Sequence, residues 1–134
     1  MNDVLVDSSV VLDIFTADPV FYFRSLSLLA KWGSVCDVCI NDIIYAEVST
    51  GFTRIEDLDR SVAGAGFCLR PLPKEALFLA AKAFFQYRKR GGNKTSALPD
   101  FFIGAHAAVM GIPLITRNPV RVTAAFPSVK ILSP

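Results

Sequence analysis

The sequence has few of the residues that bind zinc or form disulfide frameworks. It contains one histidine and three cysteines among 134 residues. A small, odd number of cysteines is typical of reduced thiols, and we expect a cytoplasmic protein. Cys36 and Cys39 form a CxxC pair within a predicted strand, where side chains three positions apart point to opposite faces. We therefore interpret both as structural residues and predict neither a zinc site nor a redox site.

Charge is also scarce, and long apolar runs are absent. Charged residues make up 19% of the chain and hydrophobic residues 52%, with a net charge of +2. The hydrophobic fraction argues against disorder, and so small a net charge does not by itself predict nucleic-acid binding. No apolar run reaches the roughly 18 residues of a membrane helix, and residues 1–3 do not read as the start of a signal peptide. The length fits one domain over residues 1–134.

The sequence does contain short apolar strands that alternate with amphipathic helices. Strands are predicted at residues 4–6, 35–40, 67–69, 113–116 and 129–132. Helices are predicted at residues 10–15, 20–32, 42–50, 55–63, 74–90 and 100–110, with a polar loop at 93–98. This alternation predicts an α/β fold with a mainly parallel central sheet of about five strands and helices on both faces. Sites in such sheets form outside the carboxyl ends of the strands.

Three carboxylates lie where apolar residues predominate. Asp7 directly follows the first strand, Glu47 lies in an apolar helical stretch, and Asp100 lies in the first turn of a helix. Taken singly, each has an ordinary explanation, as a helix cap, a surface acid or an anion favoured by the helix dipole. Clustered carboxylates repel one another, and a hard cation such as Mg²⁺ or Mn²⁺ relieves that repulsion. Together the three predict one acidic pocket that binds divalent metal.

Four segments, in order along the chain, resemble those of PIN-domain nucleases and, more narrowly, VapC toxins of bacterial and archaeal toxin–antitoxin pairs. The segments are Val4–Val10, Ile43–Val48, Leu98–Ala107 and Leu114–Asn118. Each motif is weak alone, but the ordered set covers nearly the whole chain. The resemblance implies a PIN-like nuclease domain in which Asp7, Glu47 and Asp100 bind Mg²⁺ or Mn²⁺ and RNA phosphodiester bonds are hydrolysed.

The resemblance also implies roles for two residues after the fourth strand. Thr116 matches a hydroxyl near the family's site, where it could bind phosphate or metal-bound water. Asn118 stands where the family often has a fourth acidic residue. Its amide is uncharged, although its carbonyl oxygen can still bind metal or orient water. We therefore expect one tightly held metal, while one-metal and two-metal chemistry both stay open.

Basic residues are the candidate contacts to the RNA backbone. A charge run is usually a solvated face, but beside a nuclease site it gains a role in phosphate binding. The candidate substrate contacts are Arg88, Lys89, Arg90, Lys94, Arg117 and Ser8, and Arg121 adds to the smaller basic cluster around Arg117. His106 follows Asp100 by six residues, about 240° around the helix. We expect a structural or surface histidine rather than a general base.

The resemblance further implies a homodimer and a cognate VapB-type antitoxin that covers apolar surface and places a side chain in the acidic pocket. Two other interpretations stay open. Asn118 motivates a catalytically weak or inactive PIN-like binding module. A receiver-like or phosphatase-like domain would also place an aspartate after its first strand, but Ser9 stands where a phosphatase has its second aspartate.

Overall fold

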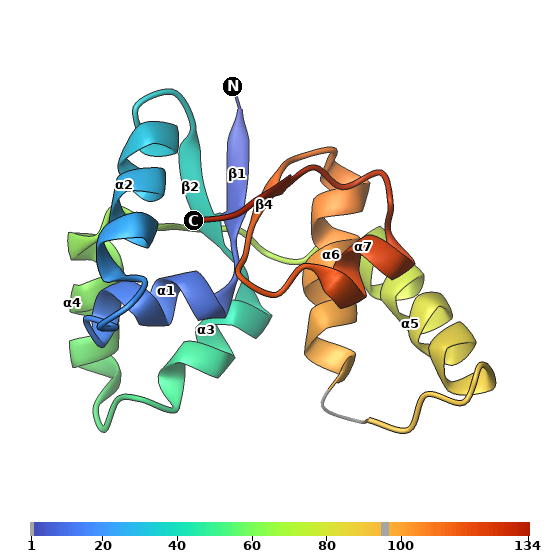
Figure 1. The fold of residues 1–134 in the computed structure, drawn as a ribbon. Helices are drawn as coiled ribbons and strands as arrows, with labels where there is room; N and C mark the ends of the chain where they lie inside the picture. The colour runs from blue at the N-terminus through green and yellow to red at the C-terminus, as the bar shows by residue number, and fades with distance from the viewer. Residues whose placement is uncertain (1, 95–96) are drawn as a thin grey trace.

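A parallel sheet forms the centre of the computed structural model, which describes residues 2–94 and 97–134 (Figure 1). Its strands are β1 (Asp3–Val6), β2 (Asp37–Ile40), β3 (Cys68–Leu69), β4 (Leu114–Ile115) and β5 (Ile131–Leu132). The order across the sheet is β3-β2-β1-β4-β5, and all four neighbouring pairs are parallel. The predicted fold class is therefore confirmed.

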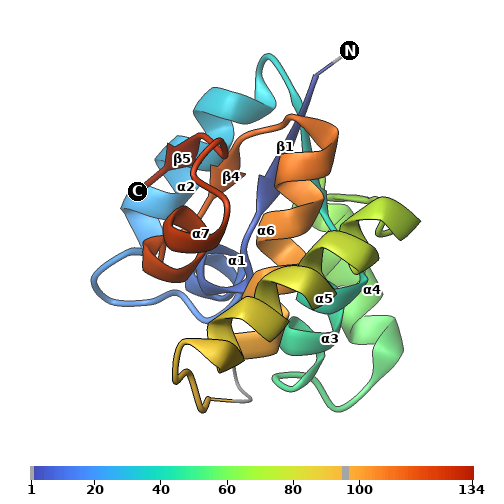
Figure 2. The ribbon, with the colours of Figure 1, turned by 90° about the vertical axis from the view of Figure 1, so that its right-hand side faces the viewer.

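Helices cover the sheet on both sides. They are α1 (Ser8–Phe15), α2 (Tyr22–Gly33), α3 (Asp42–Ser49), α4 (Ile55–Gly64), α5 (Lys74–Lys89), α6 (Leu98–Met110) and α7 (Val120–Ala125). Figures 1 and 2 show α2 on one side of the strands and the packed pair α5 and α6 on the other. None of the helices in the described part of the chain has both the length and the apolar character to span a bilayer.

β1 lies at the middle of the sheet, and its last three residues are apolar. Val4, Leu5 and Val6 are fully buried, as expected for a strand covered on both faces. The chain passes from β1 to β2 and β3 on one side, then returns to β4 and β5 on the other. The switch in direction lies between β1 and β4, and crevices in parallel sheets form at that point, beyond the carboxyl ends.

Most predicted element boundaries agree with the structure to within two residues, but one helix was missed. No helix was predicted at α7, because Val120, Val122 and Thr123 are weak helix formers and the element is short. In α5, Ala76 and Ala80 are fully buried, whereas Leu77 is 43% exposed. Part of the loop predicted at 93–98 lies outside the described residues, and α6 already begins at Leu98.

A glycine allows α6 to approach the chain that follows α7. A Cβ atom at Gly104 would lie 2.6 Å from a ring carbon of Phe126, so any larger side chain would force the two apart. The same Cβ atom would lie 3.2 Å from Val122, so Gly104 lets the middle of α6 pack closely against α7. It therefore helps to set the distance between Asp100 and Arg121, which come from these two helices.

The cysteines are free thiols and fit the structural interpretation. Cys39 is buried in β2, and burial raises its pKa to about 12, so its thiolate is scarce at neutral pH. Cys36 precedes β2 and is half-buried.

Candidate functional site

Asp7 directly follows β1 and caps α1. Its side chain is only 8% exposed. Oδ1 accepts a hydrogen bond from the backbone N–H of Ser8 at 2.8 Å, and Oδ2 accepts from the hydroxyls of Thr116 at 2.7 Å and Ser9 at 3.3 Å. A buried carboxylate is costly unless it is hydrogen-bonded, and these three donors supply that stabilisation.

Thr116 lies beside Asp7 because their strands are in register. Val6 pairs with Ile115, so the residues that follow them emerge next to each other at the same edge of the sheet. Thr116 is 1% exposed, and its hydroxyl donates to Asp7 and accepts from the backbone N–H of Asn118 at 3.0 Å. The Asn118 side chain itself is exposed. The turn after β4 is thereby tied to the carboxylate after β1.

Glu47 reaches the same edge of the sheet from α3. Its carboxylate accepts a hydrogen bond from the Ser8 hydroxyl at 2.9 Å, so Ser8 lies between Asp7 and Glu47. Burial raises the pKa of Glu47, the Ser8 hydrogen bond opposes that shift, and the charges of Asp7 and Asp100 raise the pKa further. Glu47 therefore lies close enough to Asp7 and Asp100 for their charges to act on its carboxylate.

Asp100 lies in the first turn of α6 and is half-buried. Burial raises its pKa, the hydrogen bond from Arg121 counters that effect, and the charge of Asp7 adds to the rise. Nη1 of Arg121 lies 2.7 Å from Oδ2 of Asp100. The three carboxylates thus come from separate parts of the chain into one region of mutual repulsion.

The donor set suits a hard divalent cation. It consists of carboxylate oxygens, which Mg²⁺ and Mn²⁺ prefer, and the raised pKa values of Glu47 and Asp100 reflect burial and repulsion that a cation would relieve. Within residues 2–94 and 97–134, however, no three His, Cys, Asp or Glu side chains are arranged to hold one metal ion together. Glu47 turns to Ser8 and Asp100 to Arg121. Binding one ion therefore requires side-chain rearrangement.

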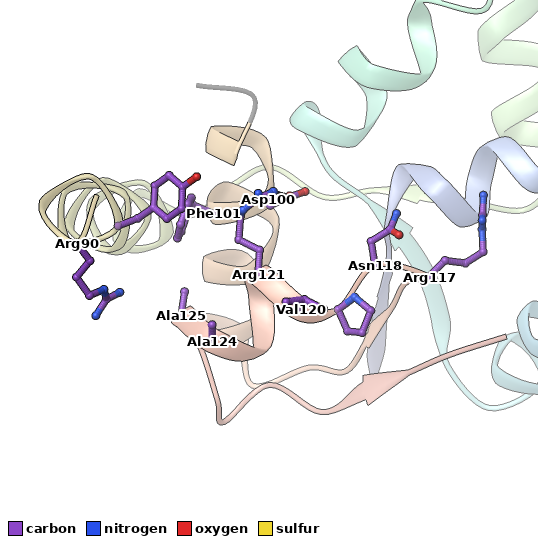
Figure 3. A pocket seen from close by; sticks show the side chains of 11 residues that line it. Arg90, Asp100, Phe101, Arg117, Asn118, Val120, Arg121, Ala124 and Ala125 are labelled. Atoms are coloured by element: carbon purple, nitrogen blue, oxygen red, sulfur yellow. Dashed lines mark hydrogen bonds and ion pairs between the residues drawn. The ribbon is translucent and has the colours of Figure 1, made fainter. Parts of the chain in front are cut away.

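A cavity of about 490 Å³ opens next to Asp100, between α5, α6 and α7 (Figure 3). Its polar lining consists of Asp100, Asn118 and three arginines, at positions 90, 117 and 121. The remaining lining residues are Tyr87, Phe101, Pro119, Val120, Ala124 and Ala125. The cavity therefore combines an apolar wall with a cationic surface beside an acidic site.

Arg117, predicted as a substrate contact, already has a protein partner. Its Nη2 atom lies 3.0 Å from Oδ1 of Asp13, which is 2% exposed, and its guanidinium lies 4.3 Å from the ring centroid of Phe21. Oδ2 of Asp13 accepts a hydrogen bond from Ser25 at 2.8 Å. Asp13 was missed from the sequence, although a lone acid in the apolar helix of residues 10–15 was a usable signal.

The structure brings only part of the predicted basic cluster to the cavity. Arg88, Lys89, Arg90 and Lys94 are all exposed, at the end of α5 and after it. Of these four, Arg90 lines the cavity. The charged groups of Arg88 and Lys89 instead lie over the rings of Phe84 and Phe85, at 5.9 and 5.6 Å from their centroids.

His106 is a buried structural residue, consistent with its predicted orientation. Asn41 caps α3 by accepting from the backbone N–H of Ile44 at 2.9 Å, so its amide nitrogen faces Nδ1 of His106 at 3.0 Å and donates to it. The imidazole is then neutral, with its proton on Nε2. Burial lowers the pKa of His106 from its ordinary 6.5, and the charges of Asp3 and Asp42 partly oppose this.

This neutral histidine predicts a loss of stability in acid. In the unfolded chain, His106 binds a proton near pH 6.5, whereas in the folded chain protonation requires a lower pH. The free energy of unfolding is therefore unaffected by this group above pH 6.5 and decreases as the pH falls below that value. One such group contributes at most about 1.4 kcal/mol per pH unit. Urea unfolding at pH 7.5 and 5.5 should show a smaller fall in stability for His106→Gln than for the wild type. Equal falls would contradict this assignment.

Comparison with known proteins agrees with the fold. The sequence model of the PIN domain matches residues 4–123. A search of curated proteins found no significant match. Among solved structures, VapBC-1 from nontypeable Haemophilus influenzae matches with TM-score 0.71 and 16% identity, covering 98% of this chain and 97% of that one.

Two further solved structures share the fold. A toxin–antitoxin complex from Klebsiella pneumoniae matches with TM-score 0.69 and 23% identity over 94% of both chains. VapC20 from Mycobacterium tuberculosis, a sarcin-ricin loop cleaving toxin, matches with TM-score 0.62 and 15% identity over 95% of this chain and 98% of that one. Identities this low support a likeness of fold alone. The match to the sequence model of the PIN domain extends over residues 4–123, which is most of the chain. The chain therefore belongs to the PIN domain family.

Proposed function

We propose that this protein is a metal-dependent endoribonuclease and the toxin of a VapBC-type toxin–antitoxin pair. The observation that carries the proposal is the approach of Asp7, Glu47 and Asp100 to one another near the switch point of the sheet. The charges of Asp7 and Asp100 both raise the pKa of Glu47, and the charge of Asp7 raises the pKa of Asp100. PIN-family membership supports a nuclease. The fold shared with a toxin that cleaves the sarcin-ricin loop favours RNA as the substrate.

In this proposal the three carboxylates hold the metal, and the surrounding hydroxyls fix their orientation. Bound Mg²⁺ or Mn²⁺ supplies an activated water and neutralises charge on the phosphate. Thr116 and Ser9 hold one oxygen of Asp7. Burial raises the pKa of both Glu47 and Asp100, and one of these two carboxylates would also orient the attacking water. Asn118 stands where the family often has a fourth acidic residue and carries no charge, so we propose one tightly held ion.

The substrate would enter along the cavity beside Asp100. Arg90 and Arg121 line this cavity and present guanidinium groups, which bind phosphate through several N–H donors. We propose that these two arginines contact the RNA backbone and that Lys89 and Lys94 add a more distant basic surface. Arg117 is expected to contribute less, because Asp13 already holds it.

The proposal includes a cytoplasmic location, a homodimer and a VapB-type antitoxin. Structures that share this fold include VapBC assemblies, which supports an antitoxin as partner. Exposed apolar residues on α2 and α5 offer surface for both contacts. They are Phe23, Leu26, Leu77, Phe78 and Phe85.

Metal-dependent cleavage of RNA is the expected result of the direct assay. Purified protein should cut labelled single-stranded and structured RNA in Mg²⁺ or Mn²⁺, and excess EDTA should reduce the rate at least about a hundredfold. DNA of the same sequence serves as the substrate control. Cleavage that survives EDTA would contradict the metal site. RNA binding with no cleavage in any divalent metal would favour the inactive binding module, for which the uncharged Asn118 is the motivating residue.

A further inference from the structure

A cation of the protein itself lies on a carboxylate of the candidate site. Nη1 of Arg121, in α7, lies 2.7 Å from Oδ2 of Asp100, in α6. The two side chains are 31% and 35% exposed. In the observed arrangement, one carboxylate oxygen of Asp100 is therefore engaged by an arginine.

This pair differs from the other arginine–aspartate pair near the site. Arg117 is bound to Asp13, which is almost fully buried and hydrogen-bonded to Ser25, so that pair resembles a fixed element of the fold. The Arg121 pair is open to solvent at the cavity wall, where its guanidinium also lies 5.8 Å from the ring centroid of Tyr87. A partly exposed pair of this kind contributes little stability and separates at low cost.

We propose that Arg121 is the resident counter-cation of Asp100: it neutralises this carboxylate in the metal-free protein, leaves it when a divalent metal binds, and then contacts an RNA phosphate in the adjoining cavity. This inference rests on the proposed nuclease function. It makes binding of metal and binding of RNA mutually dependent through one side chain.

The charges around the site explain why Arg121 would leave Asp100 when a metal binds and why it would then contact a phosphate. Asp7, Glu47 and Asp100 repel one another, and Arg121 supplies the positive charge in direct contact with Asp100. A divalent cation carries twice that charge and reaches more than one carboxylate, so it competes well with a single guanidinium. Once released, Arg121 remains on the cavity wall with Arg90, and its planar group suits a phosphate.

Calorimetric titration with Mn²⁺ tests whether Arg121 competes with the metal for Asp100. Arg121→Gln keeps part of the side-chain stem and removes the charge, so it should bind Mn²⁺ roughly threefold to tenfold more tightly than the wild type. Arg121→Lys keeps a competing cation and should stay near the wild-type affinity. Arg60→Ala removes an exposed arginine of α4 and should leave Mn²⁺ affinity unchanged. Thermal unfolding confirms that each variant is folded.

Fluorescence anisotropy with a cleavage-resistant 2′-O-methyl RNA tests whether Arg121, once released, contacts an RNA phosphate. Adding Mn²⁺ should raise the RNA affinity of the wild type several-fold more than that of Arg121→Gln, because only the wild type releases an arginine to the phosphate. Weaker or unchanged Mn²⁺ binding in Arg121→Gln would overturn the inference, since it would mean that Arg121 supports Asp100 rather than competing for it. If the wild type binds no Mn²⁺ at all, the proposed function itself fails.

Discussion

Asp7→Asn is expected to reduce RNA cleavage at least about a hundredfold while the protein stays folded. The substitution replaces one carboxylate oxygen with an amide nitrogen, which carries no negative charge and cannot bind a cation. The fold should survive because asparagine caps helices as well as aspartate, and Asp7 caps α1 through its contact to Ser8. The loss of activity would therefore report on chemistry rather than on stability.

The measurement is the single-turnover cleavage rate in saturating Mn²⁺, with thermal unfolding of the same preparation. Asp57→Asn makes the same chemical change at a half-exposed position of α4 and should keep the wild-type rate. A wild-type rate in Asp7→Asn would remove Asp7 from the site. A large fall in melting temperature beside the lost rate would show that its role in capping α1 dominates.

Asp13→Ala is expected to lower the free energy of unfolding by about 3 kcal/mol, which corresponds to a fall of roughly 10 °C in melting temperature. Removing one member of a buried ion pair leaves the other charge without compensation. Arg117 would lose its ion-pair partner, and its Nε atom is already buried without a hydrogen-bond acceptor in the described part of the chain. Ser25 would lose its acceptor as well.

Urea unfolding of Asp13→Ala and Asp13→Asn separates the two contributions. The asparagine variant can still accept from Ser25 but carries no charge toward Arg117, so its loss should be intermediate. A change below about 1 kcal/mol in Asp13→Ala would show that the pair does little for the fold. In that case Arg117 would be free to act as the RNA contact that its place in the sequence suggested.

The parts of the site that directly follow strands were predictable from the sequence. Asp7 comes after β1 and Thr116 after β4, and parallel strands bring their carboxyl ends to the same edge. Glu47 was less certain, because an acid in an apolar helix can also lie on its polar edge. Its contact with Ser8 depends on how α3 packs against α1, which local sequence does not determine.

The arginine contacts were not predictable, for a physical reason in each case. Arg121 reaches Asp100 only because α7 forms, and its β-branched residues gave no helical signal. Arg117 binds Asp13 across most of the chain length, and such a pair depends on the packing of α1 against the turn after β4. The four basic residues at the end of α5 and after it were all predicted to contact RNA. Arg90 is the one of them that lines the cavity, because of the direction of the last turn of α5, which the sequence does not determine.

The location of bound Mn²⁺ in crystals, measured by anomalous scattering, tests the central claim most directly. We predict one strong peak roughly 2.0–2.3 Å from oxygens of Asp7 and Asp100, with Glu47 bound directly or through water and Arg121 moved away from Asp100. Crystals of protein that cleaves RNA in Mn²⁺ but show no peak at these three carboxylates, or a peak held by other residues, would contradict it.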